Sequence, residues 1–285
     1  MKKIQLLFKV SRPISWINTA YPFAAAYLIL GGSVDARFII ATLFFLIPYN
    51  LLMYGVNDVF DYESDMRNPR KGGVEGAVIP KEYHRLILTT CFALAAPFIV
   101  SLMIGASVIS NLTLLAVLFF VVAYSLKGLR FKEVPVLDSI TSSLHFVGPL
   151  LYAYSFFPLS AQQYSIAAAF FLWGMASQAF GAVQDVSPDR QAGIKSIATV
   201  FGARTTVYIA ATIYLAASLV VASIGNVYGV IAAVVGLMYL LNVLVYFDIT
   251  DANSQQTGAG WKRFLLLNYL AGTVVTFCLI ASVVL

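Results

Sequence analysis

The sequence predicts an all-α membrane protein: a bundle of nine transmembrane helices around a central cavity that opens to the cytoplasmic side. Of its 285 residues, 60% are hydrophobic and only 11% are charged, against roughly 25% charged in ordinary soluble domains. The apolar residues form runs long enough to cross about 30 Å of hydrocarbon, where each run must satisfy its own backbone hydrogen bonds, which favours helices. The net charge of +5 does not indicate a nucleic acid partner, because the basic residues are confined to the loops between the runs.

Nine apolar segments account for most of the chain, and each is long enough, or nearly so, to form one membrane helix. They run over 13–31, 38–56, 86–105, 112–126, 139–157, 165–183, 205–224, 229–247 and 264–285. An acidic motif, a long loop and two further helices recur in each half of the chain. We therefore expect a single domain over residues 1–285. It has two pseudo-halves, 13–126 and 139–247, followed by the last helix, 264–285.

The loops between these segments alternate between short and long, so all the long loops lie on one side of the membrane. That side also holds all but Arg37 of the 18 Lys and Arg residues. Positive charge concentrates on the cytoplasmic side of membrane proteins. The sequence therefore predicts a plasma-membrane protein with a cytoplasmic N-terminus, cytoplasmic loops that hold the active site, and a C-terminus outside.

The first long loop opens with an acidic motif, NDVFDYESD. Its aspartates are spaced i, i+3 and i+7, which places three carboxylates on one face if the preceding helix continues through them. Carboxylate and amide oxygens suit a hard cation such as Mg2+, which usually shares its coordination shell with phosphate oxygens. The expected metal ligands of this motif are Asn57, Asp58, Asp61 and Asp65.

A second acidic motif follows the sixth apolar segment. Asp185 and Asp189 are spaced i, i+4, again on one helical face, and we expect them to bind the same cation. Basic residues beside both motifs are expected to contact the diphosphate oxygens through charge-assisted hydrogen bonds. The diphosphate-binding candidates beside the motifs are Arg67, Arg70, Lys71, Arg190 and Lys195, together with Asn57.

The two motifs, NDxxDxxxD at 57–65 and DxxxDxxxG at 185–193, resemble the signature motifs of the UbiA-type membrane prenyltransferase superfamily. The pattern of nine segments matches that superfamily as well, so the resemblance covers the whole chain. It implies an all-α bundle of nine helices, with Mg2+ as the cofactor. It also implies transfer of a prenyl group from its allylic diphosphate to a lipophilic acceptor.

The loop after the fourth segment carries a third element of this resemblance. Members of the superfamily have a Tyr-x-x-x-Lys-type loop there, and Tyr124, Lys127 and Arg130 occupy the matching places. The resemblance implies that Tyr124 faces the allylic cation and that Lys127 and Arg130 bind the diphosphate. The catalytic candidates are then Asp61, Asp185, Tyr124 and Lys127.

The motifs indicate less about the acceptor than about the prenyl diphosphate. Gly128 follows Lys127, where enzymes of the quinone pathway have Arg, which weakens the case for a ubiquinone-type aromatic acceptor. Residues 12–28 and 129–149 resemble the lycopene elongase branch, which implies dimethylallyl diphosphate as donor, lycopene as acceptor and C50 carotenoids as products. An aromatic quinone precursor or a glycerol-phosphate lipid is the alternative acceptor.

A membrane transporter is the alternative from another class of protein. Transporters usually place ionisable residues near the midplane of the bilayer. No charged residue falls in the middle of any of the nine segments, which argues against a transporter.

Overall fold

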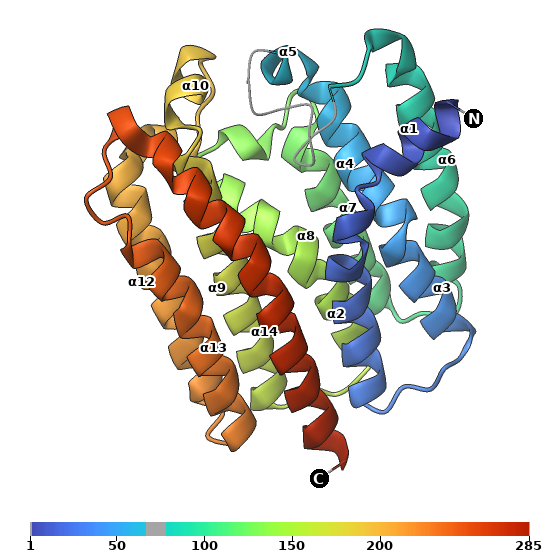
Figure 1. The fold of residues 1–285 in the computed structure, drawn as a ribbon. Helices are drawn as coiled ribbons and strands as arrows, with labels where there is room; N and C mark the ends of the chain where they lie inside the picture. Colours follow the sequence, from blue (N-terminus) through green and yellow to red (C-terminus); the bar gives the residue numbers. More distant parts are fainter. Residues whose placement is uncertain (1, 67–77, 285) are drawn as a thin grey trace. The chain divides into compact units, whose positions relative to one another are not determined.

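The computed structural model describes residues 2–66 and 78–284, and every regular element among them is a helix (Figure 1). Seven candidate membrane spans, long and apolar enough to cross a bilayer, occur among these residues. They are Ala36–Phe60, Lys81–Met103, Val108–Ser125, Ala161–Val183, Ala203–Ala222, Val227–Leu244 and Asp251–Val284. The all-α membrane class is thus confirmed, with seven candidate spans in the described chain where nine were predicted.

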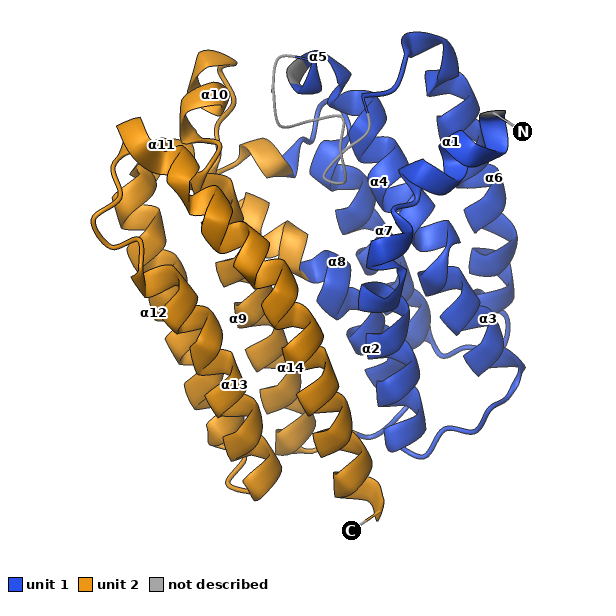
Figure 2. Cartoon of the chain, in the orientation of Figure 1, with its two compact units in different colours: residues 1–131, 144–158 blue, residues 132–143, 159–285 orange. Residues whose placement is uncertain are grey.

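The chain divides into two compact units, coloured separately in Figure 2. Unit 1 comprises Met1–Phe131 and Leu144–Pro158, and unit 2 comprises Lys132–Ser143 and Leu159–Leu285. One boundary between the units, after Ser143, falls inside a helix, α8 (Leu137–Tyr154). Another boundary, between Phe131 and Lys132, falls between the predicted pseudo-halves 13–126 and 139–247.

Unit 1 contains seven complete helices and the larger part of α8. The seven are α1 (Lys2–Val10), α2 (Trp16–Ile29), α3 (Ala36–Leu46), α4 (Pro48–Phe60), α5 (Tyr62–Asp65), α6 (His84–Met103) and α7 (Val108–Ser125), with short 3-10 turns η1 (Pro13–Ser15) and η2 (Lys81–Tyr83). A third turn, η3 (Phe131–Glu133), crosses from unit 1 into unit 2. Interlocking rings fill its core: Phe23 stacks on Tyr152 with centroids 5.9 Å apart, and Phe45 meets Tyr49 edge-on at 5.2 Å. Aromatic pairs in these geometries contribute beyond the area that they bury.

The second predicted segment is broken into α3 and α4 at Pro48, which lacks a backbone N–H and cannot continue the helical hydrogen-bond ladder. Buried side chains satisfy the carbonyls left at the break. The Asn50 amide donates to the carbonyls of Phe45 and Leu46 at 2.9 and 3.1 Å, and the Thr19 hydroxyl donates to Phe45 at 2.7 Å. The break therefore leaves the carbonyls of both residues paired inside the membrane-spanning segment.

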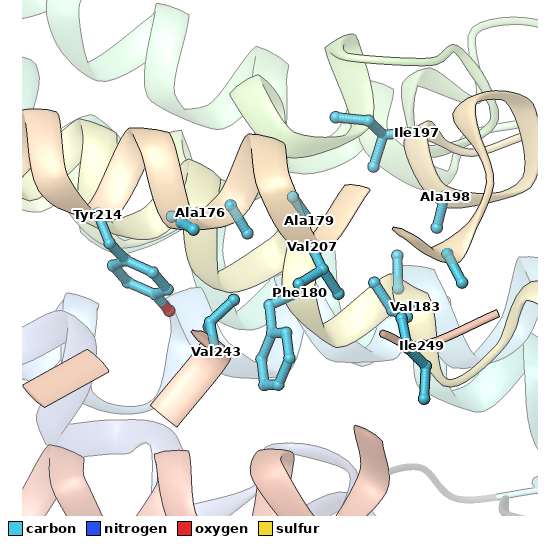
Figure 3. Close-up of a cluster of buried hydrophobic side chains, with 14 of the residues drawn as sticks. Ala176, Ala179, Phe180, Val183, Ile197, Ala198, Val207, Tyr214, Val243 and Ile249 are labelled. Atoms are coloured by element: carbon cyan, nitrogen blue, oxygen red, sulfur yellow. The ribbon is translucent and has the colours of Figure 1, made fainter. Parts of the chain in front are cut away.

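Unit 2 is built around long helices that run side by side (Figure 2). It contains α9 (Ala161–Val183), α10 (Val186–Gln191), α11 (Ile197–Phe201), α12 (Ala203–Ala222), α13 (Val227–Leu244), η4 (Asp251–Thr257) and α14 (Gly258–Val284). Its core is apolar (Figure 3) and combines small residues such as Ala176 and Ala179 with larger ones such as Phe180, Val207 and Val243. The small residues allow the helix backbones to approach closely, as is usual where helices pack in membranes.

Several helices begin before the predicted segments, and α7 and α14 show why. Helix α7 begins at Val108, four residues before the predicted start, because the Ser107 side chain accepts the Ser110 amide at 3.1 Å and caps the helix. Helix α14 begins at Gly258 and includes Arg263, whose guanidinium donates to Asn242 and to the Tyr246 hydroxyl at 3.0 and 2.9 Å. The prediction began the last segment after Arg263 because charged residues were expected in loops, and it therefore missed the first residues of α14.

Candidate active site

The first acidic motif lies at the end of α4 and continues through α5. The Asp61 amide donates to the Asn57 carbonyl at 2.9 Å, and the Asp65 amide donates to the Asp61 carbonyl at 2.8 Å. The chain is therefore helical across the motif, as the spacing of its aspartates predicts. Asp58, Asp61 and Asp65 are all buried, with 1%, 5% and 6% of their surface exposed.

Arg130 contacts the same helix end from the turn that follows α7. Its Nη1 donates to the Phe60 carbonyl at 3.3 Å, and its Nη2 lies 3.7 Å from Oδ1 of Asp61. A cation at a helix C-terminus is favourable because the last carbonyls carry partial negative charge. Arg130 itself adopts φ of +41°, a left-handed conformation that is uncommon outside glycine. The turn therefore brings one predicted diphosphate ligand next to one predicted catalytic aspartate.

Asp58 has a cationic partner of its own. Nη2 of Arg12 donates to Oδ1 of Asp58 at 2.7 Å, and the Asp58 side chain has no exposed surface. The Arg12 guanidinium also lies over the Tyr54 ring, 4.1 Å from its centroid. Asp58 was predicted as a metal ligand, and one of its oxygens is engaged in this ion pair.

The remaining candidates of unit 1 lie on or just after α7. The Ser125 hydroxyl donates to Oδ1 of Asn57 at 2.9 Å, so α7 orients the amide of the first motif. The Tyr124 ring meets the His145 ring edge-on, with centroids 4.9 Å apart. Lys127 is exposed, which leaves its ammonium accessible to a diphosphate.

The second acidic motif belongs to unit 2, where α10 follows the end of α9. Asp185 precedes α10, and the Asp189 amide donates to the Asp185 carbonyl at 2.9 Å, so the two residues are one helical turn apart as predicted. Gly193 closes α10 with φ of +72°, and the next amide, that of Ile194, donates back to the Asp189 carbonyl at 2.9 Å. The glycine of the DxxxDxxxG motif thus allows the left-handed turn that ends this helix.

Arg190, a predicted diphosphate ligand, is engaged within unit 2. Its Nε and Nη2 donate to the Thr199 carbonyl at 3.0 and 2.9 Å, and its Nη1 contacts Oδ2 of Asp251 at 2.5 Å. Oδ1 of Asp251 accepts the Ala203 amide at 2.7 Å. These contacts join α10 to the ends of α11 and α12, whereas Lys195 is exposed.

The predicted site residues are thus divided between the two units. Unit 1 carries Asn57, Asp58, Asp61, Asp65, Tyr124, Lys127 and Arg130, and unit 2 carries Asp185, Asp189, Arg190 and Lys195. The convergence of the two motifs on one diphosphate remains a prediction. Arg67, Arg70 and Lys71 lie outside the described residues.

The donor set of the acidic motifs fits Mg2+. Over residues 2–66 and 78–284, no three His, Cys, Asp or Glu side chains stand close enough together to hold one metal ion. Mg2+ does not require such a cluster, because it usually takes one or two carboxylates from the protein and completes its shell with water and substrate phosphate. Asp61 and Asp65, buried on successive turns, are carboxylates of this kind.

Three residues of structural importance near the motifs were not predicted: Arg12, Asp138 and Asp251. Asp138 is 1% exposed and accepts the Ile197 amide at 2.8 Å. Arg12 directly precedes the proline at the start of the first segment, and a charge at the edge of a membrane helix was the available signal. Asp138 and Asp251 carried no comparable signal, because each lies in a loop of mixed charge.

Comparison with known proteins agrees with the resemblance of the motifs. Residues 19–281 match the UbiA prenyltransferase family. The lycopene elongase/hydratase of Corynebacterium glutamicum is 50% identical over 283 residues, which cover 99% of this chain and 98% of that protein. The C(50) beta-cyclic carotenoids biosynthesis protein LbtBC of a Dietzia species is 51% identical over 279 residues, 97% of this chain but only 65% of that longer protein.

A solved structure shares the fold. A UbiA homolog from Archaeoglobus fulgidus, bound to DMAPP and Mg2+, superposes with a TM-score of 0.66 over 95% of this chain and 99% of that chain, at 16% identity. At that identity the likeness concerns the fold alone. With the family match over residues 19–281 and identity of 50% across nearly the full length of a relative, the chain belongs to the UbiA prenyltransferase family.

Proposed function

We propose that this protein is a lycopene elongase, which transfers the dimethylallyl group of dimethylallyl diphosphate to lycopene with the help of Mg2+. The observation that carries the proposal is the 50% identity to the C. glutamicum lycopene elongase/hydratase, which extends over 98% of that protein. The A. fulgidus homolog bound to DMAPP and Mg2+ supports the donor and the cation. In this reaction the carbon–oxygen bond of the diphosphate breaks, a terminal double bond of lycopene forms the new carbon–carbon bond, and a proton leaves.

The aspartates of both acidic motifs other than Asp58, which is paired with Arg12, are proposed to hold the cation. They are Asp61, Asp65, Asp185 and Asp189, with the Asn57 amide oxygen as a further ligand. The Ser125 hydroxyl uses one lone pair of that oxygen, and a carbonyl oxygen has a second one for a ligand. When bound, Mg2+ neutralises the negative charge that develops on the leaving pyrophosphate.

Basic side chains are proposed to bind the diphosphate oxygens that the cation does not reach. Lys127 and Lys195 are exposed, and Arg130 is next to Asp61, so all three are suited to this role. Arg67, Arg70 and Lys71 follow the first motif and remain candidates on sequence grounds. Arg190 is the weakest candidate, because its guanidinium is engaged with Thr199 and Asp251.

Tyr124 is proposed to stabilise the allylic cation with the face of its ring. Aromatic faces attract cations because the π system carries negative charge. The edge-on contact with His145 fixes the ring, and His145 is itself 4% exposed and bonded through Nε2 to the Phe120 carbonyl at 3.4 Å. A ring held in one orientation stabilises the developing charge without reorganising during the reaction.

The membrane topology is proposed from the distribution of charge. The seven candidate spans, with α2 and α8 added, give nine membrane helices. Since positive charge concentrates on the cytoplasmic side, the N-terminus and both acidic motifs face the cytoplasm of a plasma-membrane protein, and the C-terminus lies outside. A single domain with a central cavity open to the cytoplasm completes the proposal.

Expression in lycopene-producing cells tests the function. We expect C45 and C50 carotenoids to replace lycopene, whereas Asp61→Ala and Asp185→Ala should lose nearly all transfer yet accumulate in membranes as folded protein. If lycopene stays unchanged in cells that express the native chain, as it should in cells that express the active-site variants, the proposal is contradicted. Membranes incubated with Mg2+ and labelled dimethylallyl diphosphate would then be screened with an aromatic quinone precursor and a glycerol-phosphate lipid.

A further inference from the structure

Asp58 belongs to the acidic motif by sequence, but its surroundings differ from those of Asp61. Its Oδ1 accepts a hydrogen bond of 2.7 Å from Arg12, and its side chain has no exposed surface. We propose that Asp58 is a positioning residue, which with Arg12 ties the N-terminal turn to the end of α4, and that it does not bind the cation. This inference rests on the proposed Mg2+-dependent transfer only for its kinetic test.

The Arg12 side chain is held in place by several contacts. Arg12 lies in the turn between α1 and η1, with φ of +48°, a left-handed conformation that residues other than glycine rarely adopt. Its amide donates to the Lys9 carbonyl at 3.1 Å, and its carbonyl accepts the Ser15 amide at 2.8 Å. The guanidinium packs over Tyr54, 4.1 Å from the ring centroid. The turn thus presents the guanidinium to α4 in a fixed direction.

The pair acts on the residues that are proposed to bind the cation. Asp58 is the neighbour of Asn57, whose carbonyl accepts the Asp61 amide, and the Asp61 carbonyl in turn accepts the Asp65 amide. A helix that is anchored at Asp58 therefore fixes the direction of the next two turns. Arg130 contacts the same helix end at Phe60 and Asp61, so two arginines from different elements hold it.

The chemistry of the pair also argues against a metal ligand at this position. A carboxylate that accepts a short hydrogen bond from a guanidinium shares its negative charge with that group. A divalent cation on the same carboxylate would lie within a few ångströms of the guanidinium charge and be repelled by it. The Arg130 guanidinium, in contrast, lies 3.7 Å from Oδ1 of Asp61, which is beyond hydrogen-bond distance.

Mg2+ activation curves of the purified protein, with dimethylallyl diphosphate and lycopene fixed, separate the two roles. We expect Asp58→Asn and Arg12→Met each to lower kcat by roughly tenfold, as loss of a shared positioning contact does. Both should leave the Mg2+ concentration for half-maximal rate within about twofold of the native value, whereas Asp61→Asn raises it by more than about tenfold. Arg12→Lys should restore part of kcat, and Lys9→Met, at an exposed position of the same segment, should match the native protein.

The double variant Arg12→Met/Asp58→Asn provides the second test. If the two residues act as a pair, the double variant loses no more activity than either single variant, because their effects are not additive. Multiplied losses would overturn the proposal, and so would an Asp58→Asn curve shifted as far as that of Asp61→Asn. Either outcome would return Asp58 to an independent role, as a metal ligand or otherwise.

Thermal unfolding of the same variants in detergent tests the pair of Arg12 and Asp58 independently of the proposed reaction. The single variants should lower Tm, and the double variant should lower it by less than the sum of the single losses. Additive losses of Tm would show that the pair does not exist and overturn the inference. Native protein without Mg2+-dependent transfer would overturn the proposed function, while the Tm cycle would still decide whether Arg12 and Asp58 interact.

Discussion

Arg190 and Asp251 form an ion pair of 2.5 Å between Nη1 and Oδ2, which joins the end of α10 to the start of η4. Each partner also binds the chain between them. Arg190 donates twice to the Thr199 carbonyl, and Asp251 accepts the Ala203 amide at 2.7 Å. The pair therefore organises the ends of α11 and α12 next to the second acidic motif.

We expect Arg190→Met and Asp251→Asn to lower the stability of the protein. Both side chains are 43% exposed, so their ion pair contributes at most about 1 kcal/mol. Loss of the two contacts to Thr199 adds about 1 kcal/mol in Arg190→Met, whereas the amide oxygen in Asp251→Asn can still accept the Ala203 N–H, so we expect the smaller loss there. Thermal unfolding in detergent measures the change, and Lys195→Met, at an exposed lysine of the same loop, should leave Tm unchanged.

The same two variants distinguish structure from substrate binding. If Arg190 serves the fold, Arg190→Met and Asp251→Asn should alter KM for dimethylallyl diphosphate to a similar, small extent. A KM that rises at least about tenfold in Arg190→Met alone would mean that the guanidinium binds the diphosphate. Steady-state kinetics at saturating lycopene and Mg2+ decide between the two results.

Asp138→Asn is expected to destabilise unit 2 although the two side chains have nearly the same shape. Oδ1 of Asp138 accepts the Ser139 amide at 2.7 Å, and Oδ2 accepts the Ile197 amide at 2.8 Å. Whichever oxygen becomes an NH2 group then faces a buried N–H donor. An unsatisfied buried donor costs about 1–3 kcal/mol. Chemical or thermal unfolding measures this loss, and an equal Tm for Asp138→Asn and the exposed control Glu82→Gln would contradict it.

The helical architecture was predictable from the sequence because membrane-spanning segments must be continuous, apolar and helical. Of the nine predicted segments, seven correspond to candidate spans in the described chain. The break at Pro48 was not predicted, although proline is a visible signal. Its accommodation depends on Asn50 and on Thr19 from another helix, and a contact between helices leaves no trace in local periodicity.

The candidate site was predictable in its residue types and less so in its partners. The spacing of Asp58, Asp61 and Asp65 indicated one helical face, and the backbone is helical there. The ion pair of Arg12 with Asp58 joins residues that are 46 positions apart. Such a pairing depends on how helices pack, which the local sequence does not reveal. The sequence therefore predicted the same role, metal binding, for all three aspartates.

We expect the stability of variants at Gly193 to depend only on how readily the new residue adopts the backbone conformation of this position. Its φ is +72°, and no atom lies within 4 Å of the position that a Cβ would occupy. A residue that avoids the left-handed region costs roughly 1 kcal/mol more than glycine there, whereas Asn adopts it more readily. We expect stability to fall in the order Gly193, Gly193→Asn, Gly193→Ala, Gly193→Val, measured by thermal unfolding. A valine variant as stable as the asparagine variant would mean that α10 does not end in this turn.

At Gly55, in contrast, glycine is required because a side chain has no room there, and not because of the backbone conformation. A Cβ there would lie 2.6 Å from Sγ of Cys91 and 3.1 Å from Cγ2 of Ile87, because α4 and α6 pack closely at this point. Overpacking of this kind costs about 1–3 kcal/mol, and it would displace the end of α4 that carries the first acidic motif. We expect Gly55→Ala to lower both Tm and transfer activity.

Two further variants make this last prediction specific. Gly272→Ala, in α14 with no atom within 4 Å of the added Cβ, should be neutral or slightly stabilising, since alanine favours helix over glycine. Cys91→Ala removes the sulfur that the new methyl group would strike. The double variant Gly55→Ala/Cys91→Ala should therefore recover much of the Tm and activity that Gly55→Ala loses. Without that recovery, the loss would stem from Ile87 or from the backbone of α4 and not from the contact with Cys91.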